Sequence, residues 1–487
     1  MKRVLSILLL LVVILIACSS AIEPRRAEDV VLLPPQWDAD GEESDPAPPL
    51  PEWGELFDDG RLDALIAEAI EANRGLEAAA ARVERAAAQA RIAGADLYPQ
   101  LSATMDAGRR RQNFIGLPIP GAEDRVLTNT STTFGTGLNV SWEVDLWGRL
   151  RSARAAARAD AESVRADLSA AQLSIAGQVA KTWFSVIEAA EQVELAVATL
   201  ENRELTAERI RRRYEAGLSP SVDLRLAESS SALAASRLQQ RRRQLDAASR
   251  QLEILLGRYP AAAIEPLDGL PDLLVPIPPG IPASVLARRP DLRVAERRVT
   301  AASARVAQAR ASLYPQLRLT GSGGTTSTEL QDLLDGDFSV WSLGAGLLQP
   351  VFQGGRLRAN VDLARAVEDE ALAGFGQSVL SALAEVETAL FAQDVLARQE
   401  EALALAAMNA AEAQRTAEQR YASGLSDFLL LLEAQRQAFE AESQLLDLRR
   451  QRLASRVDLY LALGGDAAAR LESPDGAVEL ASDRNAP

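Results

Sequence analysis

The spacing of apolar residues predicts that most of this chain forms very long helices. No proline lies within residues 121–219 or 351–473, and apolar side chains recur at heptad-like intervals through both stretches. The pattern predicts a helix from Leu146 to Ala216 of about 70 residues, roughly 105 Å at about 1.5 Å per residue. A second such helix is predicted from Arg356 to Ser423. Helices this long need neighbours that cover their apolar stripes.

Shorter helices flank each long one. Gly217 and Gly424 mark turns, and a returning helix is predicted after each turn. The predicted returning helices are Ser221–Leu256 and Asp427–Leu463, and the predicted opening helices are Arg61–Asp96 and Asp291–Ser312. Stacked end to end, the opening and returning helices could lie antiparallel along the long one. A solvated coiled-coil rod is the alternative.

Between the opening and long helices the period of the pattern falls from about 3.6 to 2. Apolar and polar residues alternate in four stretches, 100–107, 133–142, 317–320 and 341–347. Strands of about ten residues with one apolar face are typical of membrane barrels. The intervening loops, 109–131 and 321–337, are rich in Gly, Thr, Asn and Asp. The alternative is a soluble hairpin packed on the helices.

Four strands are too few to close a barrel, because even a barrel filled by its own side chains takes about eight. An open sheet edge in lipid would leave backbone groups without hydrogen bonds. We therefore expect several copies of the chain to assemble with cyclic symmetry.

The chain is internally duplicated. Ala95–Leu101 returns as Ala311–Leu317, Val144–Leu150 as Val351–Leu357, and Arg213–Ser219 as Arg420–Ser426. The first pair is offset by 216 residues and the other two by 207, so the length difference falls inside one loop. Matching landmarks in the same order predict two copies of one structural unit.

The first residues indicate export. Lys2 and Arg3 precede an apolar run from Val4 to Ala17, which is short for a membrane span and the right size for a signal peptide. The run ends in Leu-Ile-Ala before Cys18, which resembles a bacterial lipobox, so we expect a diacylglycerol and an N-acyl chain on Cys18. By resemblance to bacterial lipoproteins, Ser19 rather than Asp after the cysteine favours delivery to the outer membrane. A membrane helix that happens to end in cysteine is the alternative.

Composition narrows the function. Hydrophobic residues make up 47% and aromatic residues only 5%, as in long helices and coiled coils. The net charge of −16 disfavours a nucleic-acid partner. The chain has one cysteine and no histidine, so an internal disulfide is excluded and the commonest general base and metal ligand are missing. We therefore expect no enzyme, no metal and no further cofactor.

These features together resemble a known family. The duplicated layout, two Tyr-Pro-Gln-Leu stretches, two Arg-Tyr-x-x-Gly-Leu-Ser turns and the Arg288–Leu292 motif are similar to the TolC/OprM outer-membrane factor family. The NodT-like lipoprotein branch that serves RND-type efflux is the most similar. The resemblance covers residues from about Trp53 to Gly465.

The resemblance implies a mainly α fold with a transmembrane β-barrel portion. Three chains would form a long α-helical barrel in the periplasm and a twelve-stranded β-barrel in the outer membrane. It implies an exit duct for small molecules, with no chemistry in this subunit. The implied partners are two further copies of the chain, a periplasmic adaptor, an inner-membrane RND-type pump and outer-membrane lipid.

The helical turns are candidate adaptor-docking tips. They comprise Gly217, Leu218 and Ser219 in the first repeat and Gly424, Leu425 and Ser426 in the second. Glycine suits the left-handed residue that ends a helix. Ser219 is predicted to cap the next helix, with Pro220 at its first position. Hairpin structure alone would also explain these residues, and both interpretations can hold together.

Acids behind the turns are candidate gate residues. By resemblance, the acids matching Asp223 and Glu433 close or line the periplasmic entrance, and the tyrosine matching Tyr421 hydrogen-bonds to the acid matching Asp223. The family usually has Asp where this chain has Glu433, which keeps the charge and changes its reach. Arg436 lies within helical reach of Glu433. Each charge is also typical of a solvated helix face.

The sequence thus predicts six segments and leaves two competing functions. The segments are a signal peptide at 1–17, a lipidated Pro-rich segment at 18–54, a first repeat at 55–265, a linker at 266–282, a second repeat at 283–465 and a disordered tail at 466–487. The competitors are a coiled-coil lipoprotein that tethers membrane to cell wall, and an enzyme. The tether predicts no strands with a lipid-facing side.

Overall fold

The computed structural model describes most of both predicted repeats. The described residues are 34, 37–38, 53–57, 59–114, 127–267, 269–273, 277, 280, 282 and 288–465. The predicted signal peptide, Cys18 and the predicted tail lie outside them. The chain divides into two compact units. The strand unit contains the described residues of 85–162 and 296–375, and the helical unit contains those of 31–84, 163–295 and 376–465.

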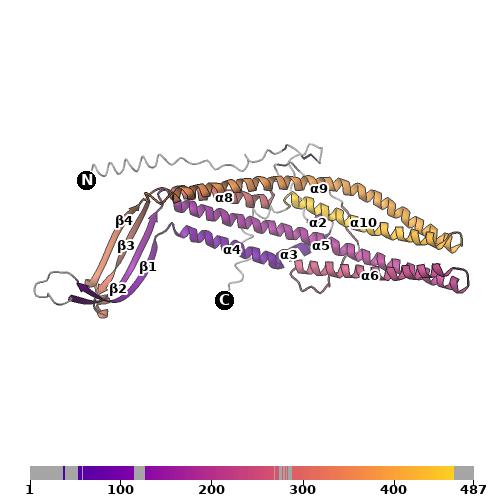
Figure 1. The fold of residues 1–487 in the computed structure, drawn as a ribbon, viewed down its shortest axis with the longest axis horizontal. Coiled ribbons are helices and arrows are strands. Elements are labelled where there is room, and N and C mark those ends of the chain that lie inside the picture. Colours follow the sequence, from indigo (N-terminus) through magenta and orange to yellow (C-terminus); the bar gives the residue numbers. More distant parts are fainter. Residues whose placement is uncertain are drawn as a thin grey trace. The chain divides into compact units, whose positions relative to one another are not determined.

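The helices confirm the predicted duplicated pattern (Figure 1). The long helices are α5 (Arg149–Glu215) and α9 (Arg356–Ala422), the returning helices are α6 (Ser221–Leu255) and α10 (Phe428–Ala462), and the second opening helix is α8 (Pro290–Ala311). Each of these bounds lies within three residues of its prediction. Within the described residues, no helix combines the length and apolar composition that a membrane span requires.

The first opening helix is not continuous, contrary to the prediction. A short helix α2 (Trp53–Phe57) precedes α3 (Gly60–Ala72), and α4 (Arg74–Ala95) follows after a break at Asn73. Asn73 has extended backbone angles, φ −67° and ψ 121°. Its side-chain oxygen accepts hydrogen bonds from the amides of Gly75 and Leu76 at 2.9 and 3.2 Å. The asparagine therefore ends one helix and caps the next.

The strand unit holds one antiparallel four-stranded sheet in the order β1-β2-β3-β4 (Figure 1). The strands are β1 (Gln100–Phe114), β2 (Leu127–Val144), β3 (Gln316–Ser327) and β4 (Ser339–Leu348). β1 and β4 are the edge strands, and every residue of β4 is exposed. The predicted alternation is confirmed, because pairing puts Met105, Leu138 and Leu343 on the same face as their apolar neighbours.

The predicted loops are shorter than expected. β1 and β2 continue to Phe114 and Leu127, which pair with each other, so both ends of the predicted loop 109–131 are strand. Threonine-rich β2 favours this extension. The predicted loop 321–337 contains the end of β3 and two 3₁₀ turns, η2 (Leu330–Leu334) and η3 (Gly336–Phe338).

Aromatic side chains join the two repeats at the helix end of the sheet. Trp147, which begins the approach to α5, donates from Nε1 to the carbonyl of Pro315 at 2.7 Å and stacks on Tyr314 at 5.0 Å. Arg149 forms a two-pronged ion pair with Glu143 at 2.8 Å. Both predicted landmarks, the Tyr-Pro-Gln-Leu stretch and the start of the long helix, thus meet here.

The core of the helical unit is an aromatic cluster around the middle of α5. Trp183 and Phe184 are fully buried, and Phe184 packs on Phe57 with ring centroids 4.9 Å apart. The indole of Trp183 donates to the Asp59 carboxylate at 2.7 Å. The same carboxylate caps α3 through the amides of Arg61 and Leu62. This core fixes the base from which two helical hairpins, α5–α6 and α9–α10, extend within the unit.

Candidate functional site

Both hairpins turn through the same backbone motif. Gly217 and Gly424 have φ of +73° and +74°, the left-handed region that favours glycine. The amide of Leu218 donates to the carbonyl of Arg213 at 2.7 Å, and Leu425 donates to Arg420 at 2.8 Å. This is the Schellman ending of a helix. All six predicted tip residues therefore lie on two matching turns, and their role in docking stays a prediction.

The start of α6 differs from the prediction. Pro220 occupies the N-cap position, where its side chain offers no hydrogen-bond acceptor. Ser219 lies one residue before it, outside the capping position. The Ser219 hydroxyl instead donates to the Asp223 carboxylate at 3.0 Å. At the second turn, Asp427 caps α10 by accepting from the amide of Leu430 at 2.9 Å. The predicted capping role of Ser219 is therefore wrong, because the turn places the proline at the helix entrance.

A small apolar cluster, the tip cluster, joins the two hairpins. Its buried members are Ala207, Ile210, Ala227, Ala417, Phe428, Leu431 and Ala434, with Leu224, Tyr421 and Leu432 packed against them. Members come from α5, α6, α9 and α10. Tyr421 lies against Phe428 at 5.9 Å between ring centroids, and the guanidinium of Arg213 lies 5.3 Å from the Tyr421 ring. The tyrosine is thus held between the first turn and the second.

Asp223 and Tyr421 are not hydrogen-bonded to each other in the described single chain. Asp223 accepts from Ser219, four residues before it, and the ring of Tyr421 lies against Arg213 and Phe428. The bond implied by the family resemblance is therefore absent from this arrangement. Asp223 is instead tied to its own turn.

Glu433 and Arg436 do form the predicted pair. The two charged groups are joined by two hydrogen bonds, Nη2 to Oε1 at 2.6 Å and Nε to Oε2 at 3.0 Å. Gln437 also donates to Glu433 at 2.9 Å, and Arg436 reaches Glu440 at 2.6 Å. Hydrogen bonds from Arg436 and then from Gln437 lower the pKa of Glu433. Glu433 and Glu440 raise the pKa of Arg436.

The pair lies on an exposed face of α10. The side chains of Glu433 and Arg436 are 45% and 48% exposed. Together with Glu440, this face carries two carboxylates and one guanidinium, a net charge of −1. It can therefore interact with cations, and the acid remains ionised at any pH near neutrality.

A buried polar layer behind the tip cluster escaped the sequence analysis. Arg203 of α5 donates to the side-chain oxygen of Gln435 on α10, and Gln435 donates to Asn202 at 2.6 Å. Asn202 in turn donates to Glu418 of α9 at 3.1 Å. Burial, and then the charge of Arg237, lower the pKa of Arg203, whereas Glu418 opposes this. The layer links both hairpins through directional bonds.

A signal for this layer does exist in the sequence. Gln435 lies four residues after Leu431 and three before Ala438, and so falls inside the apolar stripe of α10. A polar side chain on such a stripe usually has a hydrogen-bonded partner when buried. The partner itself is on another helix, which the pattern of one helix does not identify.

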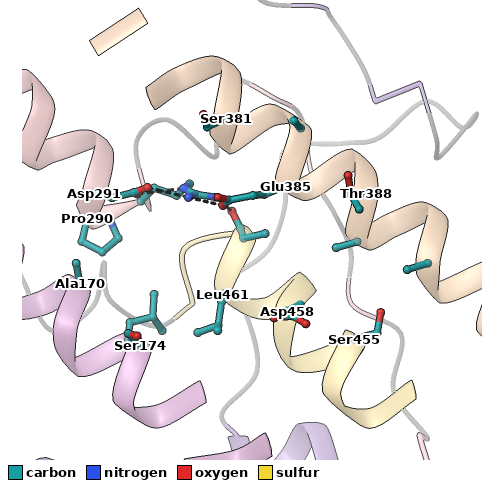
Figure 2. A pocket seen from close by; sticks show the side chains of 16 residues that line it. Ala170, Ser174, Pro290, Asp291, Ser381, Glu385, Thr388, Ser455, Asp458 and Leu461 are labelled. Carbon is teal, nitrogen blue, oxygen red and sulfur yellow. Dashed lines mark hydrogen bonds and ion pairs between the residues drawn. The ribbon is translucent and has the colours of Figure 1, made fainter. Parts of the chain in front are cut away.

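The Arg288–Leu292 motif has a structural role (Figure 2). Arg289 is 93% buried beside a cavity of about 730 Å³ lined by α5, α8, α9 and α10. Its guanidinium contacts Asp291 and Glu385 at 2.7 Å each and the carbonyl of Ala462 at 3.0 Å. Burial lowers the pKa of Arg289, but the bonds to Asp291 and Glu385 outweigh it and raise the pKa overall. The arginine ties the start of α8 to α9 and to the end of α10.

The described residues contain no group of three or more His, Cys, Asp or Glu side chains placed to hold a metal ion. What the site offers is therefore a pair of packed hairpin turns, a charged face on α10 and a polar layer behind them.

Comparisons with known proteins agree on one family. The sequence model described as "Outer membrane efflux protein" matches residues 65–258 and 281–465. Outer membrane protein OprJ of Pseudomonas aeruginosa is 36% identical over 85% of this chain and 86% of its own length. Pyoverdine export outer membrane protein OpmQ of Pseudomonas putida is 34% identical over 94% of this chain and 96% of its own length.

The fold agrees as well. A solved structure of the outer-membrane channel OprN superposes with a TM-score of 0.83 at 28% identity, covering 93% of this chain and 100% of that one.

Proposed function

This chain belongs to the outer membrane efflux protein family, and from that premise we propose that three copies of it form the exit duct of a tripartite efflux system. The duct passes small molecules from an inner-membrane RND-type pump and a periplasmic adaptor to the outside. The subunit itself contributes passage and gating and performs no chemistry.

The observation that carries the proposal is the open sheet with one apolar face. β1 and β4 each leave an edge without a partner strand in the described chain. Exposed apolar side chains such as Leu101, Trp341 and Leu347 lie on one face, where lipid would solvate them. In lipid such edges must be paired. Three copies supply twelve strands, which is an even number within the range of membrane barrels.

The tips supply a surface for the adaptor. Leu218 and Leu425 hold equivalent positions in the two turns and are 69% and 70% exposed. Each therefore offers an apolar side chain on a rigid, hydrogen-bonded turn. A helical hairpin of a partner could cover several such side chains around a trimer.

We propose that Cys18 carries a diacylglycerol and an N-acyl chain that anchor the trimer in the inner face of the outer membrane. The support is the apolar run that ends in Leu-Ile-Ala before Cys18. OpmQ is named for pyoverdine export, and that cargo is a property of OpmQ. The cargo of this duct follows from the pump that feeds it.

We assign the gate to the α9–α10 turn and the charged face behind it. Threefold symmetry would make a ring of Glu433, Arg436 and Glu440 with a charge of −1 per chain. Such a ring raises the local concentration of cations. Arg213 lies against the Tyr421 ring and so joins the two hairpins near their turns, whereas Ser219 holds Asp223 within the first turn.

The test is conductance of the purified trimer in a planar bilayer. We expect open-channel conductance with a preference for cations, and Glu433→Gln should weaken that preference and the block by multivalent cations. The matched control is Glu412→Gln on α9. Glu412 is also exposed and is held by an arginine three residues later, at 2.5 Å.

The outcomes separate the duct from its gate. A protein that forms no conducting trimer would overturn the exit-duct proposal. A conducting trimer in which Glu433→Gln leaves selectivity and block unchanged, or in which Glu412→Gln has the same effect, would overturn only the assignment of the gate.

A further inference from the structure

Three consecutive arginines lie near the loop end of β1. Arg109, Arg110 and Arg111 are all exposed and precede the end of the strand at Phe114. Side chains alternate along a strand, so Arg109 and Arg111 share one face and Arg110 lies on the other. Pairing with β2 fixes which face this is. Leu101 opposes Val140 and Ala107 opposes Phe134, and the same face continues to Arg109 and Arg111.

Two of the arginines therefore continue the apolar face that the proposed function turns toward lipid. They are opposite Thr132 and Thr130 of β2. Among the described residues, no acidic side chain forms an ion pair with Arg109 or Arg111. As far as the described residues go, both guanidinium groups are thus available to an anion.

Their height along the strand matches the edge of the hydrocarbon layer. Arg111 lies ten residues beyond Leu101, about 33 Å along the strand at roughly 3.3 Å per residue. A strand tilt of about 40° reduces this to roughly 25 Å across the membrane, which is about the height of the apolar band of such barrels. Long basic side chains at this level extend their charge to the headgroups.

We propose that Arg109 and Arg111, with Thr130 and Thr132 beside them, form a binding site for the phosphate of a lipid headgroup in the outer leaflet. This inference rests on the proposed function, since it requires the sheet to cross the membrane. A guanidinium presents a planar fork of donors that matches phosphate oxygens. Two forks on one face, spaced two residues apart, can hold one phosphate or two adjacent ones.

Placing these two arginines at the middle of the membrane would be energetically costly. A guanidinium on the lipid face is strongly destabilising at the middle of the membrane and nearly neutral at its surface. The pair therefore favours the placement at the headgroup level, where an anionic partner is present. Arg110 on the other face points into the proposed lumen and takes no part in lipid binding.

The experiment uses the full-length trimer in phosphatidylcholine vesicles. Energy transfer from the tryptophans to dansyl-labelled phosphatidic acid is compared with transfer to dansyl-labelled phosphatidylcholine. We expect the protein to enrich the phosphatidic acid. Each basic side chain near an anionic surface contributes roughly five-fold, so Arg109→Gln with Arg111→Gln should lower the enrichment by about 25-fold at low salt.

Two variants serve as controls. Arg110→Gln removes the same charge from the same strand on the other face and should leave the enrichment unchanged. Arg109→Lys with Arg111→Lys keeps both charges and should retain most of it. Conductance of the same trimers in planar bilayers shows that each variant is folded and inserted.

Several results would overturn the site. One is a conducting double glutamine variant that enriches phosphatidic acid as the unmodified protein does, and another is an equal loss in Arg110→Gln. If millimolar inorganic phosphate displaces the labelled lipid, the ligand is free phosphate and the lipid assignment is wrong. A protein without conductance would count against the duct, which separates the failure of the two proposals.

Discussion

The two hairpin turns share their backbone and their Gly-Leu-Ser sequence, and they differ in how each enters its returning helix and in how it packs. Both end a 67-residue helix with a left-handed glycine and the same Schellman hydrogen bond. At an offset of 207 residues, Pro220 corresponds to Asp427 and Ser221 to Phe428. The first turn thus enters its returning helix without a side-chain cap, and the second has both a cap and a buried anchor.

The equivalent tyrosines of the two turns, Tyr214 and Tyr421, also differ in their packing. Tyr214 is 43% exposed, whereas Tyr421 packs against Phe428 and under Arg213. The second repeat therefore supplies the aromatic contacts of the tip cluster, and the first supplies Arg213 and the aliphatic residues Ala207, Ile210, Leu224 and Ala227. Duplication preserved the turn because the backbone requires glycine there, and the packing of the two tips became complementary.

The largest loss of stability should come from Phe428→Ala. The side chain is 3% exposed and touches both hairpins through the tip cluster. Truncating a buried phenylalanine costs about 3–5 kcal/mol in unfolding free energy, from lost transfer energy and the cavity left behind. Thermal unfolding of the purified protein followed by circular dichroism measures the loss.

The equivalent position in the first repeat is the control. Ser221→Ala should change stability by less than about 0.5 kcal/mol, as exposed substitutions do. Equal destabilisation by the two variants would show that the two turns are packed alike, contrary to the structure.

Much of the helical architecture could be predicted because its signals are local. Glycine at the two turns, proline-free stretches and heptad spacing placed the ends of α5, α6, α9 and α10 within three residues. The break at Asn73 was missed because it depends on tertiary contact. The Asn73 side chain donates to the carbonyl of Leu255 at the end of α6, on a segment 182 residues away.

The site was predictable in part for the same reason. The Glu433–Arg436 pair follows from spacing on one helix and was found. The partner of Arg203, in contrast, is Gln435 on another helix. The residue pattern along one helix predicts contacts between residues three or four positions apart. Contacts between the two hairpins depend on how the helices are rotated against each other.

The next largest loss of stability should come from replacing the left-handed glycine that the two turns share. Gly217→Ala and Gly424→Ala should each cost about 1–2 kcal/mol, because a side chain in the left-handed region strains the backbone. A Cβ at either glycine meets no atom within 4 Å, so steric contact adds nothing. The two losses should therefore be equal in thermal unfolding, unlike those at Phe428 and Ser221.

Asparagine is the informative second substitution at these glycines. It tolerates the left-handed region better than alanine, so Gly217→Asn and Gly424→Asn should recover part of the stability. Unequal losses between the two turns, or no recovery with asparagine, would mean that something other than backbone strain keeps glycine there.

The smallest loss of stability should distinguish the N-terminus of α6 from that of α10. Asp427→Ala removes the carboxylate that accepts from the Leu430 amide and should cost about 1 kcal/mol. Ser219→Ala removes a hydroxyl that serves the Asp223 carboxylate and caps no helix, so its cost in thermal unfolding should be smaller. Equal losses would mean that Ser219 does support the start of α6, as its sequence first indicated. A clear difference would show that only the second turn relies on a side-chain cap, and that proline stiffens the first.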